Sequence, residues 1–105
     1  MTLARISPRA MRDIREVFDH IAANDPQAAR RVREAILDTA DLLASNPELG
    51  TLVRHAARRH EKIRWFVLPR FRSYLLFYMP FEETIAVVRV LHAARDWTRF
   101  FPKKP

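Results

Sequence analysis

With 105 residues, the chain is long enough for one compact domain with a modest hydrophobic core and too short for two such domains. It contains no cysteine, which excludes disulfide scaffolds, thiolate metal sites and cysteine catalysis, and which suits a reducing cytoplasm. The first 14 residues carry Arg5, Arg9, Arg12 and Asp13 without an apolar run. We therefore expect neither a signal peptide nor a membrane span, and predict a cytoplasmic protein.

The net charge of +7 is concentrated in the second half of the chain. Residues 1–50 hold seven basic and eight acidic side chains, whereas residues 51–105 hold twelve basic and four acidic ones. A basic surface with few internal counter-ions favours an anionic partner, either nucleic acid or an acidic protein. Basic runs also occur as plain solvated surface, so that alternative stays open.

The first half of the chain predicts a short strand followed by a helix. Residues 2–6 favour the strand, and Ser7 and Pro8 suit the N-cap and first position of the helix. Apolar side chains then recur at helical spacing and predict a buried stripe. Its members are Met11, Ile14, Phe18 and Ile21, widened by Ala10, Val17 and Ala22.

A second helix begins in the same way, with Asp25 as N-cap and Pro26 as first residue. Its predicted buried stripe is Ala29, Val32, Ile36, Ala40 and Leu43, helped by Ala28, Thr39 and Leu42. Asn46, Pro47 and the single glycine, Gly50, predict its end. Because the link between the helices is very short, we expect an antiparallel helical hairpin.

The second half predicts a meander of strands after a basic linker over residues 51–62. Residues 63–68, 73–79 and 84–92 are rich in β-branched and aromatic side chains. Links as short as those between them require antiparallel neighbours. The middle strand is apolar on both faces, so we expect it at the centre of the sheet.

The segment VVRVLHAARDW, residues 87–97, places cations on an apolar strand. Simple alternation puts Ile85, Val87, Arg89 and Leu91 on one face and Ala86, Val88, Val90 and His92 on the other. A guanidinium in such an apolar row requires an acidic partner within the fold, a route to water, or an anionic binding partner. The sequence alone leaves these three alternatives open.

We expect one domain over residues 1–105. Residues 98–105 are predicted to form a loose C-terminal tail, although Trp97, Phe100 and Phe101 suit a short docked segment with a loose end. The four histidines lack a metal-binding spacing, and no glycine-rich phosphate loop is present. We therefore expect no metal and no cofactor.

Four features in order resemble the ParE branch of the RelE/ParE toxin superfamily over nearly the whole chain. They are ISPRAMRDI at residues 6–14, the hairpin closed by Ser45-Asn46-Pro47 before Gly50, the aromatic strand at residues 74–78, and VVRVLHAARDW. The resemblance implies an α+β fold, with an N-terminal strand and an antiparallel helical hairpin packed on a twisted antiparallel β-sheet. It also implies the toxin of a bacterial type II toxin–antitoxin pair, neutralised by a cognate antitoxin. ParE-like members act on DNA gyrase, and RelE-like members cleave messenger RNA on the ribosome.

The chemistry of RNA cleavage helps to choose between these branches. It requires a general base, a general acid and cations that hold the phosphate; RelE-like nucleases supply them from strand lysines and arginines and a tyrosine near the C-terminus. Arg64, Arg72 and Arg89 suit the phosphate-holding part, and His92 is a candidate base. However, the strands contain no lysine after Lys62, and residues 95–97 are Arg-Asp-Trp where that tyrosine would lie. Tyr74 and Tyr78 fit packing with hydrogen-bonded hydroxyls better than catalysis.

The nuclease set is therefore incomplete, and we favour a binding protein that inhibits gyrase over an enzyme. The alternatives are a metal-independent endoribonuclease of the RelE type, and an inactive relic that serves only as a binding module. The candidate target-binding residues, expected on the exposed sheet and the C-terminal region, are Arg64, Arg72, Arg89, His92, Arg95 and Trp97. The expected partners are an acidic antitoxin and DNA gyrase, with operator DNA bound only through the antitoxin and no membrane. Replacement of Arg89 or Arg95 by Ala is expected to lower toxicity while the fold survives.

Overall fold

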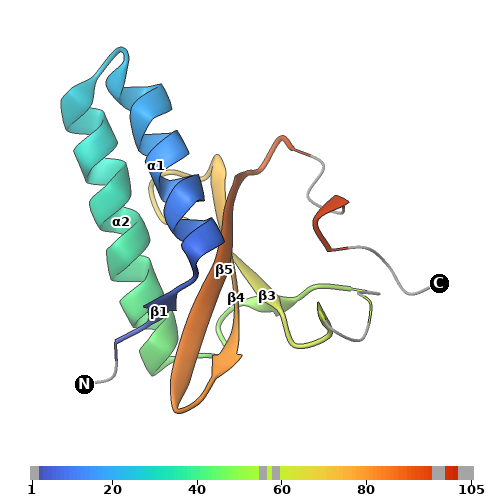
Figure 1. Cartoon of the computed structure of the whole chain (residues 1–105). Helices are drawn as coiled ribbons and strands as arrows, with labels where there is room; N and C mark the ends of the chain where they lie inside the picture. Colours follow the sequence, from blue (N-terminus) through green and yellow to red (C-terminus); the bar gives the residue numbers. More distant parts are fainter. Residues whose placement is uncertain (1–2, 55–56, 58–59, 96–98, 102–105) are drawn as a thin grey trace.

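Both helices of the molecule lie against one face of a single sheet (Figure 1). The computed structural model describes residues 3–54, 57, 60–95 and 99–101. Its elements in chain order are β1 (Arg5–Ile6), α1 (Pro8–Ala22), α2 (Pro26–Ser45), β2 (Thr51–Leu52), β3 (Arg64–Val67), β4 (Tyr74–Phe81) and β5 (Thr84–His92). The predicted α+β class, with a helical hairpin on a sheet, is confirmed.

The strand order is β1-β5-β4-β3-β2, so β4 is central, as predicted from its apolar character on both faces. Strands β2 to β5 pair antiparallel with their neighbours, whereas β1 pairs parallel with β5. The predicted antiparallel pairing is confirmed for β3, β4 and β5, and the N-terminal strand adds a parallel edge, where the two helices form part of the long connection that parallel pairing requires. The first strand is also shorter than predicted, because residues 3 and 4 lie outside it; residue 2 lies outside the described part of the chain.

The helix boundaries follow from the predicted caps. The Ser7 side chain accepts a hydrogen bond from the Ala10 N–H, and the Asp25 carboxylate accepts one from the Ala28 N–H, both at 3.0 Å. The main predicted stripe of α2 is buried along its length, whereas Leu42, predicted to support it, is 45% exposed. On α1 the buried face is rotated toward Ala10 and Asp13, which leaves Met11 53% exposed and corrects its assignment to the core. Neither helix of the described chain is long and apolar enough to cross a membrane.

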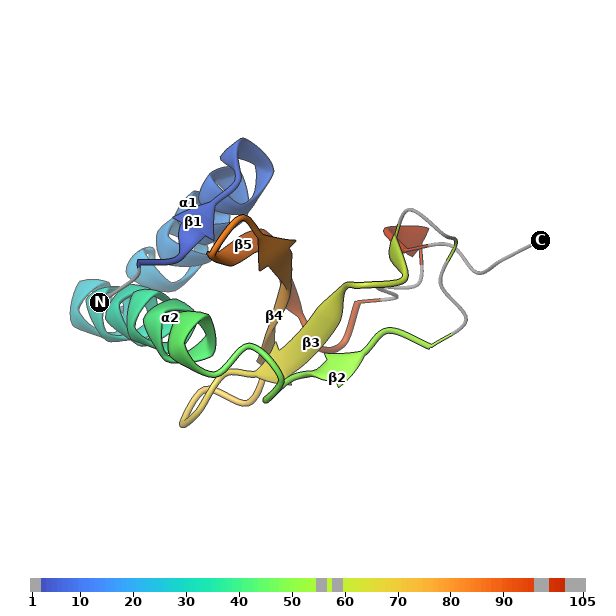
Figure 2. The same ribbon diagram turned by 90° about the horizontal axis from the view of Figure 1, so that it is seen from below.

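The main core lies between the helices and the sheet. Its strand side chains include Leu76 and Tyr78 from β4 and Ile85, Val87 and Val90 from β5. Figure 2 shows the two-layer arrangement that encloses it. These apolar side chains are removed from water by the amphipathic faces of α1 and α2, and this burial is the main stabilising contribution to the fold.

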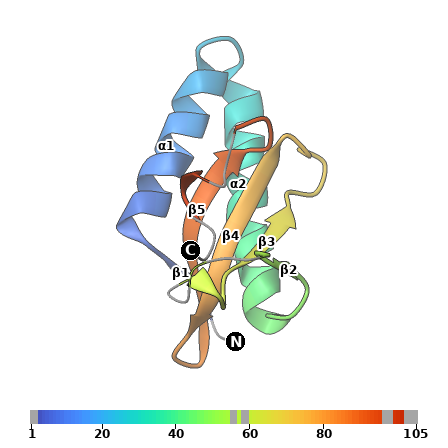
Figure 3. The same ribbon diagram turned by 90° about the vertical axis from the view of Figure 1, so that its right-hand side faces the viewer.

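A second, smaller core covers the opposite face of the sheet, which Figure 3 views from the side away from the helices. It contains Val53, Ile63, Leu75, Phe77, Leu91 and Phe101. Phe101 is only 4% exposed, and its ring stacks on Phe77 with 4.6 Å between the centroids. The prediction of a loose tail from residue 98 is therefore wrong at Phe101, because stacking and burial fix this ring. Residues 98 and 102–105 lie outside the described residues.

Tyr78 ties the segment after α2 to the centre of the sheet. Its hydroxyl donates a hydrogen bond to the Pro47 carbonyl at 2.8 Å and accepts one from the Gly50 N–H at 2.7 Å, which confirms the packing role predicted for this tyrosine. Gly50 is required here, because a Cβ atom at this position would lie 2.5 Å from the Tyr78 Oη atom. Burial raises the pKa of Tyr78 above its usual 10.0, a rise opposed by the Gly50 hydrogen bond and by the nearby charge of Arg64.

Candidate functional site

A β-bulge in β5 sets the geometry of the candidate site. Tyr78 pairs with Val87, and Phe77, the residue before it in β4, pairs with Arg89, so Val88 is an extra residue in β5. The predicted strict alternation of side chains therefore fails after Val87. Val87 and Val90 both face the helices, while Val88 packs against the second core.

The bulge coincides with a break in the edge pairing of β5. The β1 register covers Ala86 and Val87 and then ends. Beyond this point, side chains at the start of α1 form hydrogen bonds with the backbone groups of β5 that β1 leaves unpaired. The Ser7 hydroxyl donates to the Val88 carbonyl at 3.3 Å, and the Asp13 carboxylate accepts from the Val90 N–H at 3.0 Å. Side chains of α1 thus replace a strand neighbour here.

Asp13 and Arg89 form a buried ion pair between α1 and β5. The Arg89 Nε and Nη2 atoms donate to the two carboxylate oxygens at 2.7 and 3.1 Å, a bidentate geometry. The Asp13 side chain is 3% exposed and that of Arg89 12% exposed, and Arg9 approaches the same carboxylate at 3.7 Å. The sequence left three alternatives open for Arg89: an acidic partner within the fold, a route to water, or an anionic binding partner. The structure shows the first of these, an ion pair within the fold. The expectation that Arg89 stands on an open sheet face is therefore wrong.

Arg89 also connects the strand to the C-terminal segment. The Cζ atom of Arg89 lies 4.3 Å from the centroid of the Phe100 ring, and that of Arg95 lies 5.2 Å from the same centroid. Guanidinium groups at such distances from an aromatic ring are attracted to it by its quadrupole. Asp13, Arg89 and Phe100 thus form a continuous chain of contacts from α1 to the segment after β5.

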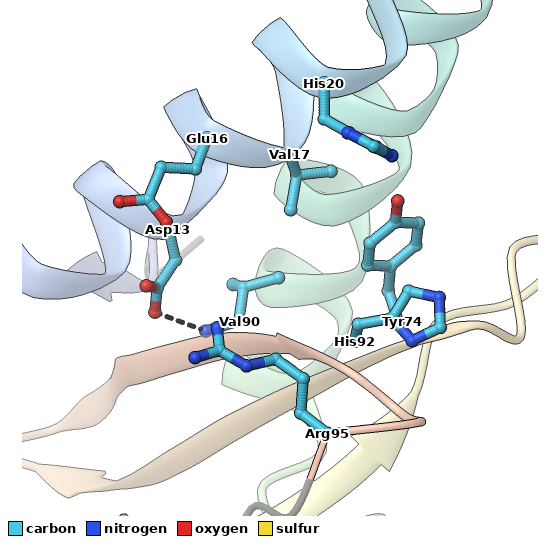
Figure 4. Close-up of a pocket in the computed structure, with 8 residues that line it drawn as sticks. All are labelled: Asp13, Glu16, Val17, His20, Tyr74, Val90, His92 and Arg95. Atoms are coloured by element: carbon cyan, nitrogen blue, oxygen red, sulfur yellow. Dashed lines mark hydrogen bonds between the residues drawn. The ribbon is translucent and has the colours of Figure 1, made fainter.

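Beside this ion pair, a pocket of about 310 Å³ opens between α1 and the end of β5. It is lined by Asp13, Glu16, Val17, His20, Tyr74, Val90, His92 and Arg95 (Figure 4). In Figure 4 the Tyr74 hydroxyl points toward His20. The α1 side of the pocket carries the carboxylates of Asp13 and Glu16, and the segment that follows β5 contributes Arg95. Among the described residues, no group of three or more His, Cys, Asp or Glu side chains is placed to hold a metal ion.

The neutral His92 ring can donate a hydrogen bond from Nε2, because its Nδ1 atom already accepts one. The Ala94 N–H donates to the His92 Nδ1 atom at 3.0 Å, so the proton of the neutral imidazole lies on Nε2. The ring also packs edge-on against Tyr74, with 5.4 Å between the centroids. In this arrangement neutral His92 offers an N–H group, whereas a general base must offer a lone pair.

The structure gathers three of the six candidate residues and separates the others. Arg89, His92 and Arg95 lie at the end of β5 beside the pocket. Arg64 lies on β3, where its Nη1 atom donates to the Gly50 carbonyl at 2.7 Å, and Arg72 is exposed in the turn between β3 and β4. Trp97 lies outside the described residues. The second core lies on the sheet face on which these side chains were expected, and of the described candidates Arg64 and Arg89 are engaged by the protein itself.

Sequence reasoning missed Asp13 and Phe100. Asp13 carried a usable signal, because it lies on the same face of α1 as Ala10, Ile14 and Val17. A carboxylate in such an apolar stripe indicates a partner from another element. No comparable signal identifies Phe100, since its contacts with Arg89 and Arg95 depend on the path of the chain after β5.

Comparisons with known proteins agree with this fold. The family described as the ParE toxin of the type II toxin–antitoxin system parDE matches residues 4–97. Toxin RelE2 of Caulobacter vibrioides is 32% identical over 87 residues, which is 83% of this chain and 90% of that protein. A chain of the chromosomal ParDE toxin–antitoxin system from P. aeruginosa superposes with a TM-score of 0.70, covering 88% of this chain and 96% of that one. At 17% identity, this last likeness shows the fold alone.

Proposed function

The chain belongs to the ParE toxin family of type II toxin–antitoxin systems, and from this membership we propose that it arrests growth by binding and inhibiting DNA gyrase. The family implies a cognate antitoxin as partner. Gyrase is the target that the ParE resemblance implies, whereas a similar protein from Caulobacter vibrioides bears the name RelE2. The choice between gyrase and messenger RNA therefore rests on the chemistry of the site.

The dispersal of the arginines is the observation that carries the proposal. Cleavage of RNA requires cations that converge on one phosphate. Arg64 is bound to the Gly50 carbonyl, and Arg89 is bound to Asp13. Arg72 lies beyond the opposite end of β3 from Arg64. Two of the three candidate phosphate ligands are thus engaged by the protein itself, which supports binding over nuclease chemistry.

The acid and base candidates support the same choice. Neutral His92 presents N–H rather than a lone pair, and the Tyr78 hydroxyl is held by Pro47 and Gly50 in the interior. Tyr74 and His20 line the pocket, but among the described lining residues Arg95 is the single arginine or lysine. A surface that binds a macromolecule needs no such convergence, since its contacts are distributed.

The proposal is tested by two assays on the purified chain. One measures supercoiling by gyrase, and the other measures cleavage of messenger RNA in translating ribosomes. We expect loss of supercoiling, restored by the cognate antitoxin, and intact RNA. Codon-placed cuts in the RNA with unaffected gyrase would overturn the proposal and favour a RelE-type endoribonuclease.

Growth on expression without the antitoxin separates a working toxin from an inert relic. We expect arrest with the unaltered chain and recovery when the antitoxin is co-expressed. Normal growth at a confirmed level of folded protein would indicate a binding module without toxicity.

A further inference from the structure

Two short segments carry nearly all of the net charge of the chain. Residues 54–62 hold four basic side chains and one acidic one, and residues 95–104 hold the same numbers. Each segment therefore has a net charge of +3, and together they account for +6 of the total of +7. Some of these residues lie outside the described part of the chain and enter the argument only through the sequence.

Described residues of these two segments lie in contact with each other. The Phe101 ring contacts the His60 ring edge-on, with 5.5 Å between the centroids, and joins Val53 and Ile63 in the second core. Figures 1 and 2 show residues 60–63 and 99–101 at the side of the sheet away from the helices. Residues about forty positions apart in the sequence thus form one end of the molecule.

The described cations of this end are exposed and have no internal counter-ions. Arg54, Lys62, Arg95 and Arg99 are all exposed. In the described part of the chain, the ion pairs join Asp13 to Arg9 and Arg89, so no described carboxylate lies within 4.0 Å of these four side chains. We refer to these four residues as the basic end. Cations without fixed internal partners attract an anion from solution.

The distribution of apolar side chains indicates what kind of anion this is. The large exposed apolar residues of the described chain are Leu3, Met11, Leu37, Leu42, Leu49, Leu52 and Phe81, and none belongs to residues 53–63 or 93–101. A protein partner is normally held by apolar and aromatic anchors at the centre of its interface. The non-specific affinity of a protein for a nucleic-acid backbone comes mainly from its cations and needs no apolar anchor.

We propose that the basic end binds the phosphate backbone of duplex DNA without sequence preference. The choice of duplex DNA rests on the proposed function, since DNA is the substrate that gyrase holds. In this arrangement the toxin contacts DNA in the gyrase complex through the basic end. Arg95 also lines the pocket beside Asp13, whereas the helical hairpin stays available for protein contacts.

The test measures binding of the full chain to a fluorescently labelled DNA duplex by anisotropy, at several salt concentrations between about 50 and 200 mM. The test variant is Arg54→Gln/Lys62→Gln/Arg99→Gln. The matched control, Arg12→Gln/Arg30→Gln/Arg31→Gln, removes the same charge from exposed positions on the helices. Far-UV circular dichroism and thermal melting verify that both variants are folded.

We expect the affinity of the unaltered chain to fall steeply with salt. The test variant should bind about tenfold or more weakly at low salt, with a slope of log K against log salt smaller by about 2 to 3, because each lost phosphate contact removes about 0.9. The control should change the affinity by no more than about twofold. No binding by the unaltered chain, or equal losses in the two variants, would overturn the inference.

Two further outcomes assign a failure to its cause. If the test variant loses affinity for the cognate antitoxin but keeps it for DNA, the basic end is a protein-binding surface and the inference is wrong. If the unaltered chain inhibits gyrase without binding DNA, this inference fails and the proposed function stands. DNA binding with unaffected gyrase supports the inference and removes the proposed function.

Discussion

At Asp13, one carboxylate that is 3% exposed accepts hydrogen bonds from the Arg89 guanidinium and from the Val90 N–H. A buried charge is tolerated only when its oxygen atoms are satisfied in this way. Removal of either partner therefore has a larger effect than removal of an exposed charge. The earlier expectation that Arg89→Ala leaves the fold intact is revised by this geometry.

We predict that Arg89→Ala lowers the free energy of unfolding by about 2–4 kcal/mol, because the Asp13 carboxylate stays buried without its main counter-ion. Arg95→Ala is the matched control, since Arg95 is exposed, and it should change stability by no more than about 0.5 kcal/mol. Denaturant unfolding followed by circular dichroism measures both. Equal midpoints for the two variants would show that the Asp13 pair contributes little.

Tyr78 gives a pH-dependent prediction. Burial raises the pKa of its hydroxyl above 10.0, so the folded state holds the proton more tightly than the unfolded state does. Stability is then fully present below about pH 10 and is lost as the pH rises through the folded-state pKa. The Tyr78→Phe variant lacks the hydrogen bonds to Pro47 and Gly50 and should be less stable by about 1–3 kcal/mol at neutral pH. Because it has no hydroxyl to titrate, the decline in stability that Tyr78 causes at alkaline pH should be absent from this variant. Unfolding near pH 9 and near pH 11 tests it; an identical decline in the two proteins would contradict it.

At the scale of elements, the segment after β5 contributes to the fold through Phe101. This ring fills the second core and stacks on Phe77. Phe101→Ala is predicted to cost about 3 kcal/mol of stability, because it leaves a cavity that the surroundings fill only in part.

Phe81→Ala serves as control for this loss, since Phe81 is exposed in the hairpin between β4 and β5. It should cost less than about 1 kcal/mol. Thermal or denaturant unfolding compares the two variants. A similar small effect of both would indicate that the segment around Phe101 is dispensable for the fold.

The helical hairpin offers apolar side chains that the fold does not use. Met11, Leu37 and Leu42 are exposed on α1 and α2. A groove of about 360 Å³ on the hairpin is lined by Met11, Ile14, Phe18 and Arg33, among others. An antitoxin segment that lays apolar side chains on a helical surface and meets arginine with carboxylates fits this composition.

We predict that Leu37→Asp weakens antitoxin binding at least about tenfold, because it places a charge among buried apolar contacts. Gln27→Asp adds the same charge at an exposed position near the start of α2 and should have little effect. Isothermal titration calorimetry with the purified antitoxin measures both affinities. Unchanged binding by Leu37→Asp would exclude the hairpin surface as the docking site.

The sequence predicted the elements well where local signals set them. The caps at Ser7 and Asp25, the stripe of α2 and the central position of β4 all follow from spacing and residue type. The bulge at Val88 was not predictable, because it depends on the start of α1 supplying hydrogen bonds where β1 ends. The error in the alternation of β5 then carried over to the predicted orientation of Arg89.

For the whole molecule, the candidate site was predicted only in part. Arg89, His92 and Arg95 do lie together, since three-residue spacing at the end of one strand keeps them near each other. Arg64 and Arg72 do not join them, because the register of β3 and its turn places these side chains elsewhere. The charge of the two basic segments was visible in the sequence, but their meeting depends on the docking of Phe101.

The central claim is that this toxin acts by binding and not by chemistry. The most direct measurement is a titration of gyrase at fixed concentration with the purified chain, followed by supercoiling activity. A binding inhibitor should reduce activity only as the chain becomes stoichiometric with gyrase, and removal by the antitoxin should restore the enzyme. Growth arrest with gyrase fully active at excess toxin, together with RNA cleavage at substoichiometric amounts of the chain, would contradict the account.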